Sequence, residues 1–368
     1  MAIVRVDLGE RSYEIVVGSG ILPRVGQEIG RVCRGRAALV LTEPAVGGLY
    51  GSDVTKSLLA AGFQAFTAEV AGGEESKTLA SAADLYDRLL DARIDRTGVL
   101  VTLGGGVVGD LGGFVAATYM RGIDFVQIPT TLLAQVDASI GGKVGVDLPR
   151  GKNLVGAFYQ PKRVLIDPDV LATLPRREFS SGLAELIKHG IIADQELFAF
   201  IRSETEALRR LDRNVLETAI ARSCEIKAGI VARDERESGI RAVLNYGHTV
   251  GHAVEAATGF AKYAHGEAVS IGMVTAALIS EAKGLAARGT AEEIADGLAA
   301  VGLPVALSDD VDTDAIVGAM TYDKKTMFGK LRFVLPRRIG EVEVTDAVTE
   351  AEVRSALAEQ ARMFGKGA

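Results

Sequence analysis

Residues 98–110 read GVLVTLGGGVVGD, an apolar run followed at once by three glycines and then by a helical pattern. An unbroken apolar run is typical of a strand buried on both faces of a sheet. Gly104, Gly106 and Gly109 satisfy the G-x-G-x-x-G spacing between a strand and a helix, where glycines let a pyrophosphate approach the backbone. The motif fits a tight turn equally well, because it begins about a hundred residues into the chain and no acidic residue ends the next strand.

Strand and helix patterns alternate on either side of this stretch. Strand patterns recur at residues 3–8, 13–18, 37–42, 125–129 and 164–167. The first two alternate apolar and polar residues and predict an antiparallel pair, whereas the others are buried strands. Helical patterns at 52–61 and 78–92 lie between them. The alternation predicts a mostly parallel sheet with helices on both faces and ligands at the carboxyl ends of its strands.

The pattern changes near residue 175. Seven of the nine prolines lie at or before Pro175, and strand patterns nearly vanish after it. Helical patterns then follow at 180–192, 194–210, 214–234, 247–257 and 267–287. We therefore predict an α/β domain over 1–175 and an all-α domain over 176–368, with a cleft between them.

The composition is that of a cytoplasmic enzyme. Hydrophobic residues make up 48% of the 368 and charged residues 24%, which is ordinary for a globular protein. No apolar run reaches membrane-spanning length, and no signal peptide precedes the first strand pattern. Cys33 and Cys224 have no partner motif and predict free thiols in a reducing compartment. The net charge of −7 argues against a nucleic-acid surface but allows a local basic pocket.

Three of the four histidines lie in residues 245–267, NYGHTVGHAVEAATGFAKYAHGE. His248 and His252 are four apart and share one face of a helix, and His265 follows a glycine-containing turn. Any one of them fits a structural role, but imidazole is the commonest metal ligand among side chains, so the cluster predicts a metal or catalytic site.

Two further groups of polar residues add to this chemistry. Glu185 and Lys188 are three apart on a predicted helix and fit a surface ion pair, yet a glutamate with two histidines would complete a catalytic zinc site. Arg121, Lys143 and Lys152 lie among glycines after strand ends. Basic residues are usually solvated, but here they predict a pocket for phosphate or carboxylate.

Taken in order, these stretches resemble the 3-dehydroquinate synthases of the sugar-phosphate cyclase superfamily. The resemblance rests on GGGVVGD, TYMRG, PTTLLAQVDASIGGK, GKNLVGAFYQP, SGLAELIKHG, LNYGHTVGHAVE and HGEAV, and it covers nearly the whole chain. It implies conversion of 3-deoxy-D-arabino-heptulosonate 7-phosphate to 3-dehydroquinate and phosphate in the shikimate pathway. It also implies transient oxidation of a substrate hydroxyl by NAD, phosphate elimination, re-reduction and aldol closure, in a homodimer of dehydroquinate synthase-like fold. In that fold the α/β domain over 1–175 is a Rossmann-like NAD-binding domain, and the all-α domain over 176–368 binds the metal and the substrate.

The resemblance also implies roles for individual residues. Glu185, His248 and His265 match ligands of Zn²⁺ or Co²⁺, and His252 matches a proton-relaying histidine near the phosphate. Catalytic positions are His252, Lys143, Lys188, Asp137 and Glu237. Substrate positions are Arg121, Lys143, Lys152, Asn153, Lys188, Lys227, Arg241, Asn245, His252, and one of Lys324 and Lys325. In the family, the arginine that Arg121 matches reaches the phosphate pocket of the neighbouring subunit. NAD positions are Gly73, Glu74, Lys77, Gly104, Gly105, Gly106, Val107, Val108, Gly109, Asp110, Thr130, Thr131, Lys143, Lys152, Val170, Leu171, Ala172 and Thr173. Tyr246 and His189 depart from the residues common in the family.

Three rivals stay open. The nearest is another cyclase, such as an amino-dehydroquinate, 2-deoxy-scyllo-inosose or 2-epi-5-epi-valiolone synthase. Arg241 and Asn245 favour the dehydroquinate branch, because a substrate with a carboxylate needs such donors. A metal-dependent polyol dehydrogenase would share the two domains but would not need the cluster of anion-binding residues. A non-enzymatic nucleotide-binding regulator would not need the Glu-His-His site.

Overall fold

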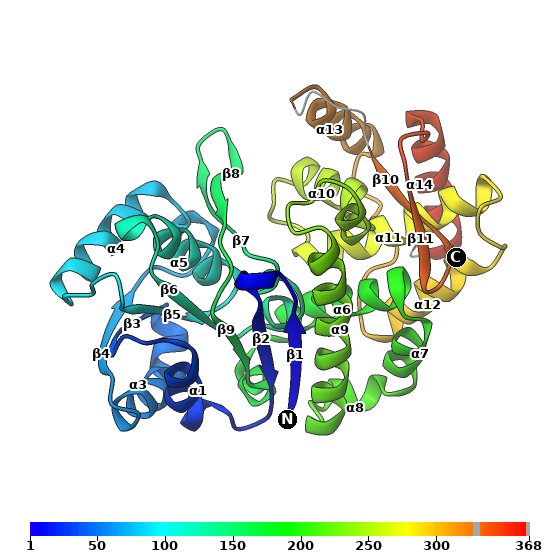
Figure 1. Ribbon diagram of the computed structural model, residues 1–368. Coiled ribbons are helices and arrows are strands. Elements are labelled where there is room, and N and C mark those ends of the chain that lie inside the picture. Colours follow the sequence, from blue (N-terminus) through cyan, green and yellow to red (C-terminus); the bar gives the residue numbers. More distant parts are fainter. Residues whose placement is uncertain (327–331, 366–368) are drawn as a thin grey trace. The chain divides into compact units, whose positions relative to one another are not determined.

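A computed structural model describes residues 1–326 and 332–365 (Figure 1). By their internal contacts these residues form two compact units. Unit 1 comprises Met1–Leu174 and Leu216–Arg236, and unit 2 comprises Pro175–Val215 and the residues from Glu237 onward. Among the described helices, none combines the length and apolarity of a membrane span. Cys33 and Cys224 are free and buried, as expected.

Unit 1 contains a seven-stranded sheet. Its strands are, in spatial order, β1 (Ala2–Val6), β2 (Tyr13–Val17), β9 (Arg163–Ile166), β6 (Asp124–Pro129), β5 (Val99–Gly104), β3 (Ala37–Thr42) and β4 (Gln64–Glu69). β1 and β2 are antiparallel, and every other pair is parallel. This confirms the sheet expected from the sequence, except that β4 was not predicted because its side chains are mostly exposed and form no apolar run.

Alternating side chains of the strands build a core on each face of the sheet. Leu39 and Leu41 belong to one core, together with α4 (Leu79–Asp91) and α5 (Gly106–Thr118). The intervening Ala38 and Val40 belong to the other, which contains α1 (Val25–Val32) and α3 (Ser52–Ala60). A strand with both faces covered favours apolar residues, and this explains why the runs AALVLT and VLVTLG each contain a single polar residue.

The strand order reverses beside β3. β4 pairs with one edge of β3, and the chain then crosses back so that β5 pairs with the other edge. Ligands of such sheets bind outside the carboxyl ends of the strands at this point. β5 ends there at Gly104, and α5 begins two residues later. The glycine motif therefore lies where the architecture favours a ligand.

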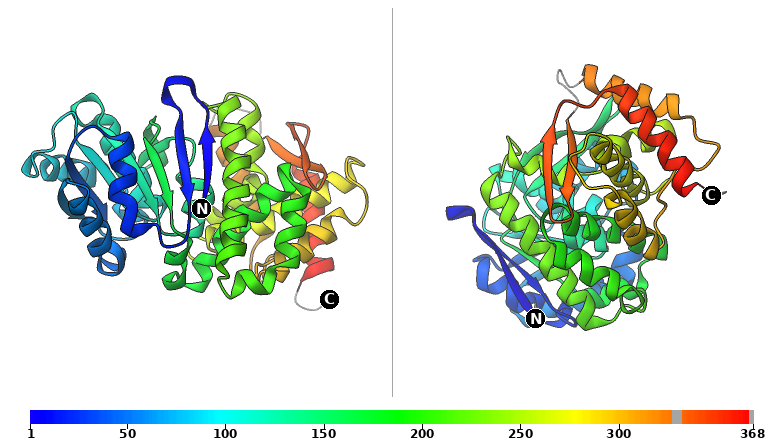
Figure 2. Two further views of the ribbon diagram at one scale, coloured as in Figure 1. Left: turned by 60° about the horizontal axis from the view of Figure 1, so that its bottom comes forward. Right: turned by 90° about the vertical axis from the view of Figure 1, so that its right-hand side faces the viewer.

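Helix α9 (Arg213–Arg233) runs alongside the β1–β2 pair in unit 1 (Figures 1 and 2). Glu217 accepts a hydrogen bond from the amide of Ser19 at 2.7 Å, and Lys227 contacts Asp137 at 2.5 Å. The sequence assigned this helix to the second domain. The sequence pattern predicts a helix but does not specify which core the helix joins. Residues 216–236 belong to unit 1 by their contacts, although they lie after the predicted boundary at residue 175.

A hairpin of β7 (Lys143–Leu148) and β8 (Gly151–Phe158) occupies the stretch that was expected to be rich in loops. It carries Lys143 at its start and Lys152 and Asn153 just after its turn. The basic residues singled out there are thus placed by strands.

Unit 2 is mainly helical, as predicted. Its helices are α6 (Arg176–Ala193), α7 (Gln195–Ser203), α8 (Thr205–Arg209), α10 (His248–Ala257), α11 (His265–Ala282), α12 (Thr290–Ala300), α13 (Thr313–Thr326) and α14 (Glu350–Phe364). It also contains an antiparallel hairpin, β10 (Phe333–Arg338) and β11 (Glu341–Thr345), which the sequence did not predict. The apolar helix α11 lies in the middle and contacts α6, α10, α12, α14 and β10.

Glycines set the spacing of the helices around α11. A Cβ atom on Gly272 would lie 2.0 Å from the carbonyl oxygen of Gly247, next to the start of α10. A Cβ atom on Gly266 would lie 2.2 Å from the carbonyl oxygen of Ser181 in α6. These contacts are between backbones, so they hold α6, α10 and α11 closer than larger residues would allow.

Candidate metal and nucleotide sites

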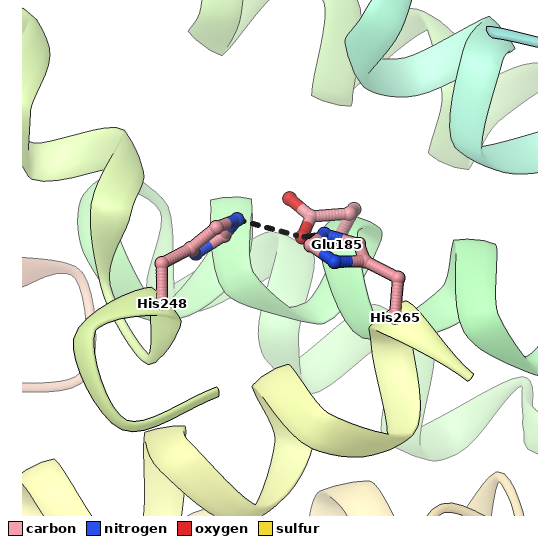
Figure 3. A group of neighbouring side chains, drawn as sticks. All are labelled: Glu185, His248 and His265. Atoms are coloured by element: carbon pink, nitrogen blue, oxygen red, sulfur yellow. Dashed lines mark ion pairs between the residues drawn. The ribbon is translucent and has the colours of Figure 1, made fainter. Parts of the chain in front are cut away.

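Glu185, His248 and His265 lie together in unit 2, as predicted (Figure 3). Glu185 is in the middle of α6, whereas the two histidines are the first residues of α10 and α11. The Nε2 atoms of His248 and His265 lie 3.5 and 3.7 Å from Oε1 of Glu185. One ligand atom from each residue falls within 4.8 Å of the others. Two nitrogens and one oxygen therefore converge on one point.

The His248 ring has a defined orientation. Its Nδ1 lies 3.1 Å from the carbonyl oxygen of Tyr246, which can only accept a hydrogen bond. The proton is therefore on Nδ1, and the lone pair of Nε2 points toward Glu185. The hydroxyl of Tyr246 is itself anchored, since it donates to the carbonyl oxygen of Met273 in α11 at 2.8 Å. Tyr246 thereby orients the His248 ring through its carbonyl group and is itself held in place through its hydroxyl group.

Burial and neighbouring charges shift the pKa values of the three residues in different directions. Burial would raise the pKa of Glu185, but Lys188 and the two imidazoles lower it well below its usual range. Burial, helped by Lys188, lowers the pKa of His248 to about 3. Burial opposes a charge on His265 too, but Glu185 and Glu255 outweigh it and raise its pKa to about 10. Glu185 is thus ionised and His248 neutral at neutral pH, as metal ligands must be.

The donor set fits a divalent metal ion. Both carboxylate oxygens of Glu185 are buried, and neither has a hydrogen-bond partner among the described residues, although Lys188 forms an ion pair with them. The carboxylate of Glu185 and the side chain of Lys188 are both almost fully buried, which excludes the surface ion pair considered above. A donor set of two imidazoles and one carboxylate suits Zn²⁺ or Co²⁺.

His252 stands beside the trio without being part of it. Its side chain is exposed, and its ring centroid lies 5.3 Å from that of His248. A second donor group, His252, Glu255 and His265, shares only His265 with the first. Glu255 had no predicted role, although it ends the motif that carries both histidines of α10.

The start of α5 fits a nucleotide pyrophosphate. The residue before α5 is Gly105, and no side chain caps the first-turn N–H groups, which remain suited to an anion. Two of the motif's glycines are also required by packing. A Cβ atom on Gly104 would lie 2.7 Å from Val108, and one on Gly109 would lie 2.7 Å from Oε1 of Gln127. The glycines of this loop can therefore both form a tight turn and let a ligand approach the backbone.

Lys77 joins two other predicted positions. Its ammonium group donates to Asp110 at 2.5 Å and to Oδ1 of Asn153 at 2.6 Å. Burial raises the pKa of Asp110 to about 6 against the opposing charge of Lys77. A predicted NAD position and a predicted substrate position thus share one lysine.

Three predicted residues have a left-handed backbone. The φ angles are 68° at Arg121 and 56° at Asn153 and Glu237. Non-glycine residues rarely adopt this conformation, and those that do gather at functional sites. Arg121 is exposed, and the turn that holds it continues into Gly122 at φ 120°.

The remaining predicted positions lie in both units. In unit 2, Arg241 is buried in the 3-10 helix η8 (Ile240–Asn245), and Asn245 donates to Glu237 at 3.1 Å. In unit 1, the amide of Thr130 donates to the carbonyl of Gly104, and Thr131 caps the following turn through Ala134. Gly73 and Glu74 flank the start of a 3-10 turn, and residues 170–173 lie in η7 (Pro168–Thr173). Lys324 and Lys325 lie in α13, but their side chains are outside the described part of the structure.

Comparison with known proteins gives a consistent picture. Family models described as 3-dehydroquinate synthase N-terminal and C-terminal match residues 67–181 and 182–326. A 3-dehydroquinate synthase of Desulforamulus reducens is 48% identical over 98% of this chain and 100% of its own.

Two solved structures resemble the chain over most of its length. A 2-epi-5-epi-valiolone synthase of Streptomyces hygroscopicus, with NAD⁺ and Zn²⁺ bound, is 28% identical, with a TM-score of 0.87 over 97% of this chain and 98% of its own. A 2-deoxy-scyllo-inosose synthase complexed with carbaglucose-6-phosphate, NAD⁺ and Co²⁺ is 26% identical, with a TM-score of 0.89 over 97% of this chain and 100% of its own.

Proposed function

The chain belongs to the 3-dehydroquinate synthase family, and we propose how its residues carry out that family's reaction. The protein is an enzyme that converts 3-deoxy-D-arabino-heptulosonate 7-phosphate to 3-dehydroquinate and phosphate. As a carbon–oxygen bond is broken by elimination, we assign it to the lyases. The observation that carries the proposal is the buried Glu185 carboxylate facing two imidazoles in a chain of this family.

Its cofactors are NAD and a divalent metal ion, Zn²⁺ or Co²⁺. The metal would be held by Glu185, His248 and His265, and when bound it supplies Lewis-acid polarisation of substrate hydroxyls. NAD would be held at the start of α5 by Gly104–Gly106 with Asp110 and Lys77, and when bound it accepts a hydride and returns it.

The chain's own residues bind and orient the anionic substrate. Lys188 and Arg241 are each 1% exposed, and Lys188 forms an ion pair with Glu185. The guanidinium of Arg241 suits a substrate carboxylate or phosphate, which it would hold by charge-assisted hydrogen bonds. Asn245 is oriented by its hydrogen bond to Glu237. His252 is exposed beside His248 and can hold or transfer a proton at the substrate.

These residues favour the dehydroquinate branch over the related cyclases. The relatives that make valiolone and inosose products are 28% and 26% identical to this chain, against 48% for the dehydroquinate synthase. The buried Arg241 suits a substrate that carries a carboxylate as well as a phosphate. The two free thiols support the proposed cytoplasmic location.

A direct comparison of substrates tests this assignment. The purified protein is given NAD, zinc and either the heptulosonate phosphate or glucose 6-phosphate, which lacks a carboxylate. We expect 3-dehydroquinate by mass spectrometry from the first substrate and no phosphate release from the second. Phosphate release from glucose 6-phosphate but not from the heptulosonate phosphate would place the chain in another branch of the cyclases.

Arg121 is proposed to act across a homodimer. The residue is exposed and has a left-handed backbone, as suits a residue that reaches a neighbouring subunit. Arg121→Ala should raise KM by about tenfold or more through the loss of a charge-assisted contact to phosphate, with the metal content unchanged. Steady-state kinetics and elemental analysis measure both quantities.

Co-expression of two low-activity variants tests whether Arg121 acts in the site of the neighbouring subunit. One chain carries Arg121→Ala and the other carries His265→Ala. The first chain keeps the metal ligand His265, and the second keeps Arg121. A mixed dimer then contains one complete site, and random pairing should restore about a quarter of wild-type activity at low substrate. Activity no higher than that of the two separate variants would show that Arg121 does not act across the dimer.

A further inference from the structure

Glu255 lies on the far side of His265 from Glu185. Its Oε1 is 3.3 Å from Nδ1 of His265, while Nε2 of the same ring is 3.7 Å from Oε1 of Glu185. The carboxylate of Glu255 is mostly buried, with 15% of its side chain exposed. The imidazole is therefore held between two carboxylates, one at each nitrogen.

The two contacts of the ring are not equivalent in the metal-loaded protein. Only one ring nitrogen can give its lone pair to the metal, and the other must then carry the proton. Glu185 is a member of the ligand trio, so Nε2 is the nitrogen that faces the metal. Nδ1 then donates its proton to Glu255.

His248 shows the same arrangement with a different acceptor. Its Nδ1 faces the carbonyl oxygen of Tyr246 at 3.1 Å, and its Nε2 faces Glu185 at 3.5 Å. Both imidazoles thus present Nε2 to the metal and are fixed through Nδ1. The acceptor at His248 is neutral, whereas that at His265 is a carboxylate, which makes the ring a stronger electron donor.

We propose that Glu255 is a positioning residue that fixes the tautomer and orientation of His265 and strengthens its bond to the metal. This inference rests on the proposed metal site and adds to it a residue outside the ligand set. Partners of this kind typically contribute about tenfold to a hundredfold to metal affinity.

Metal affinity, measured directly, tests the role of Glu255. Zinc dissociation constants are determined by competition with a chromophoric chelator for the wild type, Glu255→Ala and Glu255→Gln. We expect binding weaker by about tenfold to a hundredfold in Glu255→Ala. Glu255→Gln, which keeps an acceptor oxygen but loses the charge, should lie between the two. Glu267→Gln is a matched control, because that carboxylate lies two residues from His265 but contacts Arg177 and the Ala264 amide.

The absorption spectrum of the Co²⁺-loaded proteins separates positioning from ligation. We expect Glu255→Gln to keep the shape and intensity of the wild-type visible bands at saturating cobalt, since the ligands are unchanged. A zinc dissociation constant for Glu255→Ala within twofold of the wild type, with the control also unchanged, would overturn the inference. A changed coordination spectrum would overturn it too, because Glu255 would then be a ligand. Failure of the wild type itself to bind metal would instead refute the proposed site.

Discussion

Replacing His265 with alanine is expected to abolish metal retention and to lower kcat/KM by more than about a thousandfold, since a Lewis acid lowers the activation barrier by several kcal/mol. His265 supplies one of the three ligand atoms that converge in the assigned trio, and its neighbour Glu185 is completely buried. In this variant the buried carboxylate of Glu185 loses the metal and the His265 imidazole, and it keeps Lys188 and the His248 imidazole beside it. Elemental analysis after dialysis and steady-state kinetics measure the two losses.

His252→Ala is the matched control for this variant. His252 lies in the same cluster, yet it is exposed and outside the assigned trio. We expect it to keep its metal and to lose about a hundredfold to ten-thousandfold in turnover, the range of a lost proton relay. If His252→Ala lost its metal as His265→Ala does, while His248→Ala kept it, the second donor group would be the true site. NAD binding by both variants shows that unit 1 is intact.

Replacing Gly272 with alanine is expected to destabilise the protein by more than about 3 kcal/mol, as overpacking against backbone does in its severe cases. The added Cβ would lie 2.0 Å from the Gly247 carbonyl oxygen and 2.9 Å from the Gly251 amide nitrogen. Neither atom can turn away as a side chain would, so α10 must shift relative to α11. Because His248 begins α10, the shift should also weaken zinc binding.

Gly318→Ala is the control for the effect of packing. Gly318 lies in helix α13 of the same unit, is exposed, and a Cβ atom there would meet no atom within 4 Å. Alanine at that position should be neutral or stabilising by up to about 1 kcal/mol, since it favours the helix. Urea unfolding curves compare the two variants. Equal midpoints for Gly272→Ala and the wild type would show that α10 and α11 are not held by this backbone contact.

Much of the fold could be predicted because its patterns are strong. Strands such as β3 and β5 are buried on both faces, so their apolar runs are unbroken and their ends were predicted within about one residue. β4 and β11 were missed because they carry few buried residues, and β10 because its apolar run is interrupted by Pro336 and ends in two arginines. The membership of α9 in unit 1 depends on single contacts, such as that of Glu217 with Ser19, which no periodicity reveals.

The site shows the same division between local and tertiary information. His248 and His252 could be placed on one helical face from spacing alone, but spacing would have made them a two-ligand pair. Motif resemblance supplied Glu185, which is sixty-three residues earlier in the chain, and the structure brings it to His248 and His265. Glu255 was missed although it lies in the same motif, because only the three-dimensional path of the chain carries His265 back beside it.

The central claim is that the hydride leaves and returns within one catalytic cycle. The most direct measurement counts phosphate released per NAD bound, with absorbance at the NADH band followed in the same cuvette. With the heptulosonate phosphate, zinc and one NAD per enzyme, we predict many phosphates per NAD, no steady accumulation of NADH, and arrest by a chelator. Accumulation of NADH in step with substrate consumed, without phosphate, would contradict the account and indicate a polyol dehydrogenase.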